Sequence, residues 1–303
     1  MLAVRRIGET DLRRFVPTIH TGLPLDSRLN VMTTPAKESH LAAPIFEETK
    51  EDRQFATTLA RGLEIMRCFT PQRPMLSNKE LVQATGLPKA TISRFTYTLS
   101  RLGYMRQVPG QLKYQLGSAV LSLGYPLLAT MYARQIARRP INELASEVGG
   151  SVAMGIRDRL NMVYVETSRS NTRVAPPYTD IGYSHPIAAT SMGRAYLAVC
   201  GADARKALLN EIRVKTPDDW DRYRGSIEKS AKDFLRLGFC VSVDFFRRDI
   251  YGVAVPIRRP IDGEIVVFNC AVYSDHVSPA ELENKIGPRL MAMCRTIENS
   301  LRP

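Results

Sequence analysis

Residues 77–105, SNKELVQATGLPKATISRFTYTLSRLGYM, constrain the fold more than any other part of this chain. Ser77 and the acid three residues later form a capping box, which predicts a short helix over residues 78–84. Gly86 permits a sharp turn after that helix. Pro88 suits the first position of a longer helix over residues 88–102, because an amide proton is not needed there. Two helices joined by so tight a turn predict a helix-turn-helix.

The longer helix is expected to have one apolar and one polar face. Apolar residues at helical spacing are expected to be buried: Ile92, Phe95, Leu99 and Leu102. The opposite face carries side chains that can hydrogen-bond to base edges and phosphates, and we predict that it binds DNA: Lys89, Thr91, Ser93, Arg94 and Tyr97. This helix contains no acidic residue that would repel phosphate.

A wing is predicted after the second helix. Two extended segments, residues 104–108 and 112–116, flank the turn signal Pro109-Gly110. We expect three further basic residues, on the wing and on the preceding first helix, to contact the DNA backbone: Arg61, Arg106 and Lys113.

Positive charge is concentrated in the same region. Residues 54–117 contain nine Lys and Arg residues against two acids, Glu64 and Glu80, while the whole chain has a formal net charge of +12. Such an excess favours a polyanionic partner. We therefore predict double-stranded operator DNA as a partner.

The remaining sequence predicts three other parts. Residues 1–53 are rich in proline and lack sustained periodicity, so we expect a weakly ordered extension before a winged helix-turn-helix domain at residues 54–117. Residues 118–139 are expected to form a buried connecting helix that Pro126 kinks or divides. Residues 140–303 alternate between helical and extended patterns, which predicts an α+β domain with an antiparallel sheet covered by helices. Helices are expected over residues 141–148 and 279–301, and Asp262-Gly263 predicts a hairpin turn between the last two strands.

Neither a secretory signal nor a membrane span is predicted. The uncharged stretch 114–133 contains polar residues, two glycines and a proline, and its apolar residues recur at helical spacing. The five cysteines are dispersed and form no CxxC pair, which favours a reducing cytoplasm.

Two alternatives belong to other functional classes. Cys270 with His185 and Asp244 would be the candidate nucleophilic triad of an enzyme, and Cys240 with Cys270 and His185 a candidate metal site, fused to a DNA-binding module. Cysteine in a strand as apolar as VVFNCAVY is typical of a core residue, so we predict neither an enzyme nor a cofactor or metal. The second alternative is an architectural protein that binds DNA without a ligand.

Several segments resemble one known family. RGLEIMRCF, ELVQATGLPKATISRFTYTLSRLGYM and YQLGSAVLSLG are similar to the DNA-binding half of IclR-type regulators. PIAATSMGRAYLA, LGFCVSVDFF and YGVAVPIRRPIDGEIVVFNCAV are similar to the effector half, so the resemblance covers roughly residues 54–300. It implies a winged helix-turn-helix joined by a helix to a GAF-like effector domain, in dimers or tetramers on palindromic operators of catabolic genes. The motif TSMGR and the residue Asn269 are most similar to the sequences of the subgroup that governs aromatic-acid degradation.

The resemblance also implies where the effector, a small carboxylate, binds. The positions carried over by motif, together with a nearby acid, are Ser191, Met192, Ser242, Asp244, Ile250, Gly252, Asn269 and Ala271. Ser191 and Met192 are expected at a helix N-terminus, whose free N–H groups attract a carboxylate. Asn269 can both donate and accept a hydrogen bond.

This chain departs from the pattern of members that bind small keto acids. Those members have an acid in place of Ser242 and a cysteine in place of Gly252. The smaller Gly252 is expected to enlarge the pocket and to favour a bulkier ligand. Arg157 is a further candidate to pair with an acidic ligand, with a surface salt bridge as the alternative.

Overall fold

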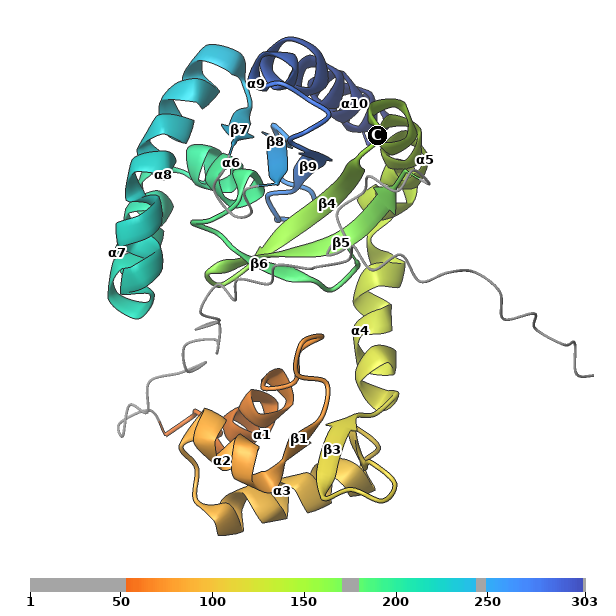
Figure 1. Ribbon diagram of the computed structural model, residues 1–303, viewed down its shortest axis with the longest axis vertical. Coiled ribbons are helices and arrows are strands. Elements are labelled where there is room, and N and C mark those ends of the chain that lie inside the picture. Colours follow the sequence, from red (N-terminus) through yellow and green to blue (C-terminus); the bar gives the residue numbers. More distant parts are fainter. Residues whose placement is uncertain (1–52, 171–179, 244–248, 302–303) are drawn as a thin grey trace, which may run out of the picture. The chain divides into compact units, whose positions relative to one another are not determined.

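The computed structural model describes residues 53–170, 180–243 and 249–301 (Figure 1). The predicted N-terminal extension lies almost wholly outside the described residues, as does Asp244. Within the described residues, no helix is both long enough and apolar enough to cross a membrane.

The N-terminal part is a three-helix unit with a small sheet. Its helices are α1 (Thr57–Arg67), α2 (Asn78–Thr85) and α3 (Lys89–Arg101). The predicted capping box is present at the start of α2, where the Ser77 hydroxyl accepts from the Glu80 amide at 3.3 Å and the Glu80 carboxylate accepts from the Ser77 amide at 2.8 Å. The helix ends at Gly86, whose φ of 70° strongly favours glycine.

The wing has one more strand than expected. β1 (Leu76–Ser77), β2 (Met105–Gln107) and β3 (Lys113–Leu116) pair in the order β1-β3-β2. The local turn signal at Pro109-Gly110 is confirmed, since Gly110 has a φ of 70°. The strand β1 was not predicted, because two residues are too short to show an alternating pattern.

The connecting region differs from the prediction. α4 (Ala119–Thr130) continues through Pro126 and ends at Met131, where α5 (Tyr132–Val148) begins and then continues through Pro140. The predicted burial is wrong for α4, because none of its residues is buried. The start of a new helix at Ile141 is also wrong, because Ile141 lies on the buried face in the middle of α5.

The C-terminal part is built on one antiparallel sheet, as predicted. Its strands are β4 (Ser151–Asp158), β5 (Asn161–Arg169), β6 (Ser184–Pro186), β7 (Cys240–Ser242), β8 (Ile250–Pro256) and β9 (Val267–Tyr273). They pair in the order β6-β5-β4-β9-β8-β7, and every neighbouring pair is antiparallel. Asp262 and Gly263 both have positive φ in the tight turn before β9, which confirms the predicted hairpin signal.

Helices cover both faces of this sheet (Figure 1). One face packs against α5 and α10 (Gly287–Ser300) through residues such as Met154 and Phe268. The other packs against α6 (Ser191–Val199) and α8 (Pro217–Leu237), with α7 (Ala202–Lys215) beside α8. A single C-terminal helix was predicted from Pro279, but α9 (Pro279–Glu281) is separated from α10 by a π-helical segment, Leu282–Ile286. The α6 side therefore carries the residues that were predicted to bind a ligand.

Candidate DNA-binding and ligand-binding sites

The polar face of α3 is exposed, as predicted. Lys89, Ser93, Arg94 and Tyr97 are exposed, and Thr91 is half-buried near the helix N-terminus. No carboxylate of the described residues lies within 4.0 Å of the amino or guanidinium nitrogens of Lys89 and Arg94. These two cations are thus available to phosphates or base edges.

The apolar face of α3 differs from the predicted stripe at its end. Ile92 and Leu99 are buried in the core with Leu81. Leu102 is 61% exposed, because α3 ends at Arg101 and the chain turns away. Thr96, which was not predicted, is fully buried instead and donates its hydroxyl to the Ser93 carbonyl at 3.2 Å.

The remaining predicted DNA contacts differ in their surroundings. Arg106 is exposed on β2. Lys113 on β3 lies 3.9 Å from the Glu80 carboxylate, and Arg61 on α1 is half-buried beside Glu64. Two of the three basic groups thus have an acidic neighbour, which makes the face of α3 the least neutralised part of the predicted surface.

The residues on the sheet that were predicted to bind a ligand share one face. Ser242, Gly252 and Ala271 are directly paired across β7, β8 and β9, and Asn269 lies two residues along β9 from Ala271. Ile250 precedes Gly252 by two residues on β8, so it has the same orientation. The structure therefore brings together all described members of the predicted site below the N-terminus of α6.

Two glycines allow α6 to lie directly on the sheet. A Cβ atom at Gly252 would lie 2.9 Å from Oγ of Ser191, and one at Gly155 would overlap Sδ of Met192. The expectation that Gly252 enlarges the pocket is therefore wrong, because the Ser191 side chain occupies the space beside it. The glycines instead determine how closely the first turn of α6 approaches the strands.

The first turn of α6 has two amides available to a ligand. The Thr190 hydroxyl caps the helix by accepting from the Gly193 amide at 3.1 Å. Within the described part of the chain, no acceptor binds the amides of Ser191 and Met192, which are both buried residues. Two unbonded N–H groups at the positive end of a helix dipole are suited to bind a carboxylate.

Asn269 is buried next to a tyrosine that the sequence did not indicate. Its side chain is hydrogen-bonded to the hydroxyl of Tyr164 on β5. Burial raises the pKa of Tyr164, and this hydrogen bond only partly opposes that effect. Among the described residues, none donates a hydrogen bond to Oδ1 of Asn269. A buried acceptor without a donor costs about 1–3 kcal/mol, so a ligand hydroxyl at this point is favoured.

The comparisons with known proteins match two separate parts of the chain. Residues 58–109 match the family described as "IclR helix-turn-helix domain", and residues 127–267 match "Bacterial transcriptional regulator IclR C-terminal". The chain is 34% identical to the HTH-type transcriptional regulator TsaQ1/TsaQ2 of Comamonas testosteroni, over 81% of this chain and 88% of that protein. This chain belongs to the IclR family of bacterial transcriptional regulators.

Two further relatives extend the comparison. The crystal structure of an IclR family transcriptional regulator from Brucella abortus is similar with a TM-score of 0.77 and 40% identity, over 86% of this chain and 98% of that one. The p-hydroxybenzoate hydroxylase transcriptional activator of Acinetobacter baylyi is 23% identical, over 87% of this chain and 97% of that protein. As an IclR-family member, the protein is a DNA-binding regulator with an N-terminal helix-turn-helix and a C-terminal effector domain.

The alternative of an enzyme has no support in this IclR-type effector domain. Cys270 lies on the α5–α10 face of β9, while His185 lies on β6, three strand spacings or roughly 14 Å away. Burial raises the pKa of the Cys270 thiol to about 12, so it is not a ready nucleophile. Cys240 belongs to the cluster on the opposite face. Within the described ranges, no three metal-binding side chains come together.

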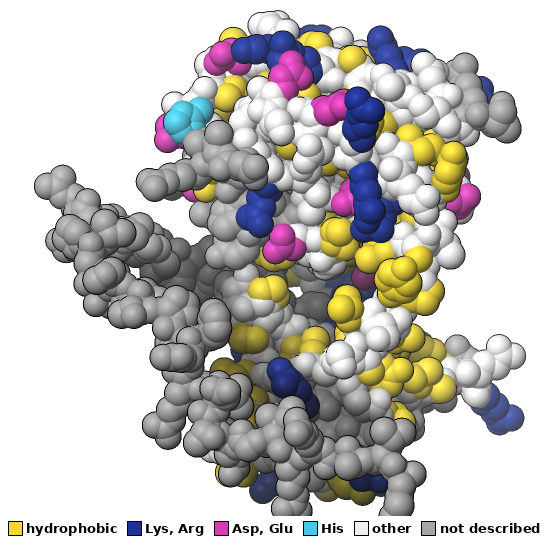
Figure 2. Space-filling view, turned by 90° about the vertical axis from the view of Figure 1, so that its right-hand side faces the viewer, with side chains coloured by type: hydrophobic (Ala, Val, Ile, Leu, Met, Phe, Trp, Pro, Cys, Tyr) yellow, Lys and Arg dark blue, Asp and Glu magenta, His cyan; other side chains and the backbone are white. Residues whose placement is uncertain are grey.

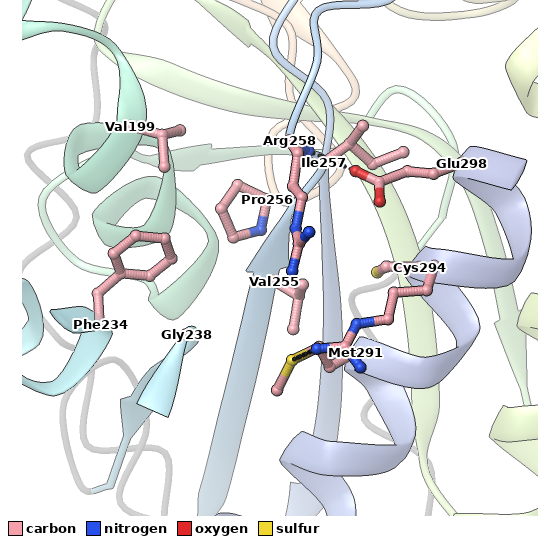
Figure 3. A pocket seen from close by; sticks show the side chains of 11 residues that line it. Val199, Phe234, Gly238, Val255, Pro256, Ile257, Arg258, Met291, Cys294 and Glu298 are labelled. Carbon is pink, nitrogen blue, oxygen red and sulfur yellow. Dashed lines mark hydrogen bonds between the residues drawn. The ribbon is translucent and has the colours of Figure 1, made fainter. Parts of the chain in front are cut away.

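A cavity of about 260 Å³ lies away from the predicted ligand site (Figure 3). It opens between α8, the end of β8 and α10, and its floor is apolar, with Phe234, Val255 and Met291. Figure 3 shows the Arg258 side chain extending into it, and the Arg258 amide donates to the Glu298 carboxylate at 2.5 Å. None of the residues predicted to bind the effector lines this cavity, which therefore supplies control positions for the ligand-binding experiments.

Two arginines near α6 have structural contacts. Arg157 Nε donates to the Tyr196 hydroxyl at 2.9 Å and Nη1 to the Arg159 carbonyl at 3.0 Å. Arg157 forms no salt bridge with a carboxylate of the described residues, and its pairing with an acidic ligand stays a prediction. Arg194 is buried in α6, and its Nε donates to the Thr190 carbonyl at 3.2 Å. Burial lowers the pKa of Arg194 to about 10, which leaves it charged at neutral pH. The arginine of the TSMGR motif is thus a buried, charged residue of α6.

Proposed function

We propose that this regulator releases or binds its operator in response to an aromatic hydroxycarboxylate held between α6 and the sheet. The ligand carboxylate accepts from the amides of Ser191 and Met192, and its hydroxyl donates to Oδ1 of Asn269. The unpaired, buried Oδ1 is the observation that carries this proposal. We expect a protein with this operator-binding role to act in the cytoplasm.

The distance between the two proposed contacts is consistent with an aromatic ring between them. Gly252, which lies under Ser191, and Asn269 are diagonal neighbours on adjacent strands, roughly 7–8 Å apart. This separation suits a benzene ring with substituents at opposite ends. The relative from Acinetobacter baylyi is named for activating p-hydroxybenzoate hydroxylase, which supports the same chemical class.

Calorimetric titration with 4-hydroxybenzoate and with benzoate tests the proposed contacts. In Asn269→Ala, we expect 4-hydroxybenzoate to bind at least fivefold more weakly, because the acceptor for its hydroxyl is lost. Benzoate, which has no hydroxyl, should bind the variant and the native protein equally. Arg258→Gln, in the separate cavity, is the control and should bind both acids normally. If 4-hydroxybenzoate binds more weakly to Arg258→Gln but not to Asn269→Ala, the ligand binds in the cavity and the proposed site is wrong.

We also infer that a second copy of this chain covers α4. The helix carries no charged residue, and Leu121, Leu123 and Tyr125 are 76%, 62% and 67% exposed. Figure 2 views the side that carries α4 and shows hydrophobic side chains gathered there. An apolar strip of this kind is favourable only when it is covered. A homodimer with two helix-turn-helix units also suits an operator with two half-sites.

A further inference from the structure

A β-bulge in β5 changes which side of the sheet its residues face. Met154 pairs with Glu166, but the next residue of β4, Gly155, pairs with Tyr164. Val165 is therefore the additional residue of the bulge. As a result, Tyr164 faces α6 whereas Val165 and Glu166 both face α5. Three consecutive residues thus connect the proposed ligand site with the helix on the other face.

Arg134, in the first turn of α5, contacts both Val165 and the next residue, Glu166. Its Nε donates to the Val165 carbonyl at 2.8 Å and lies 3.0 Å from the Glu166 carboxylate. Its Nη1 donates to the Leu128 carbonyl at 3.3 Å, in the last turn of α4. The Arg134 side chain is 11% exposed and that of Glu166 is 9% exposed. The ion pair is therefore largely shielded from water. Removal of one partner from such a buried pair strongly destabilises a protein, because the other charge stays buried without a partner.

The same arginine lies at the break between the two connecting helices. Met131 has φ −73° and ψ 92°, an extended conformation that ends α4. Arg134 spans this break, since it binds the end of α4 and the bulge of β5 at once. Arg138, one turn further along α5, binds the same Glu166 carboxylate at 2.9 Å. The position of the α4 end is thus tied to the position of β5.

We propose that Arg134 is the positioning residue through which the effector domain sets the direction of α4, the helix that follows the DNA-binding domain. The trigger rests on the proposed ligand site: a ligand that binds Asn269 alters its hydrogen bond with Tyr164, the residue before the bulge. Movement of β5 then reaches α4 through the guanidinium of Arg134.

Arg134→Gln and Glu166→Gln test this role, with Arg139→Gln as a matched control. Arg139 lies on the same helix in an exposed ion pair with Glu143, and its side chain is 88% exposed. Hydrogen exchange of the amides at residues 131–137 needs no effector. We expect it to be at least tenfold faster in both test variants and unchanged in the control. Native exchange in Arg134→Gln would overturn the proposal.

The second readout separates coupling from folding. We expect 4-hydroxybenzoate to bind Arg134→Gln within twofold of the native affinity, while its effect on the operator Kd falls at least fivefold. If Arg134 has only a structural role, Arg134→Gln lowers the temperature midpoint of unfolding, but 4-hydroxybenzoate changes the operator Kd as much as in the native protein. That result would overturn the proposal. If Arg134→Gln fails to fold, Arg134→Lys keeps the charge but loses the simultaneous contacts, and the same outcomes apply. If 4-hydroxybenzoate has no effect on the native protein, the proposed function fails, and hydrogen exchange still decides the role of Arg134.

Discussion

At the scale of single residues, Arg94 is the best test of how this protein reads DNA. It is exposed on α3, with no described carboxylate close enough to form a salt bridge. We expect Arg94→Ala to weaken operator binding by about 1–3 kcal/mol, or roughly 5- to 150-fold, and to relax the preference at the contacted base pairs. Fluorescence anisotropy with a panel of single-base operator variants measures both effects.

Arg101, at the far end of the same helix, is the matched control. It is exposed, but it lies away from the N-terminal part of α3 that was predicted to enter the major groove. Arg101→Ala should weaken binding to all duplexes by the same factor, as expected for a phosphate contact. If Arg94→Ala behaves in this same uniform way, Arg94 does not contact a base.

Residues whose role depends on their own segment could be predicted from the sequence, whereas residues whose partner is distant in the chain could not. The polar face of α3 follows from helical spacing alone. Tyr164 was not predicted, because its role depends on Asn269, which reaches it only when β4 pairs with both β5 and β9. The effect of Gly252 was misjudged for the same reason, since the side chain that fills the space comes from α6.

At the scale of elements, the seating of α6 depends on Gly193. A Cβ atom there would overlap the backbone carbonyl of Ile187, which cannot rotate away. We expect Gly193→Ala to destabilise the domain by about 1–3 kcal/mol. Gly225→Ala, in the exposed middle of α8 with open space around it, should stabilise the fold by about 0.5–1 kcal/mol. Urea unfolding followed by the single tryptophan, Trp220 on α8, measures both. Equal stability of the two variants would contradict the close approach of α6 to the Ile187 backbone.

The apolar surface of α4 makes a separate prediction about assembly. A glutamate at Leu123 would place a charge in the proposed interface, so we expect Leu123→Glu to shift the protein from dimer or larger species to monomer. Leu235 is even more exposed, at 87%, but lies on α8, and Leu235→Glu should leave assembly unchanged. Sedimentation velocity at micromolar concentration distinguishes these outcomes. A native protein that sediments as a monomer would contradict the inference.

Local signals predicted the elements well, and long-range packing explains the exceptions. The capping box of α2 and the Asp262-Gly263 turn involve neighbouring residues, and both are present. The continuation of α5 through Pro140 was not predicted, because its buried face, including Ile141 and Leu144, packs on the sheet and maintains the helix. The exposure of α4 was missed because its apolar composition is also typical of a buried helix.

At the scale of the whole molecule, two sites have to influence each other. The predicted DNA-binding face belongs to α3, and the proposed ligand site lies between α6 and the sheet. Coupling between distinct sites typically amounts to about 1–3 kcal/mol, which is a change of roughly 5- to 150-fold in affinity. Because coupling is reciprocal, operator DNA must change the affinity for the ligand by the same factor.

The most direct test is the ratio of operator Kd values with and without saturating 4-hydroxybenzoate. The operator is first selected from random duplexes with the native protein, so that no ligand is needed to find it. We predict a ratio at least fivefold from unity for the native protein. Asn269→Ala lacks the side chain that is proposed to pass the signal to Tyr164. For this variant, we predict a ratio near unity even at a ligand concentration that saturates it, with the same operator Kd as the native protein in the absence of ligand. A variant ratio equal to the native one would show that the α6–Asn269 face does not control DNA binding.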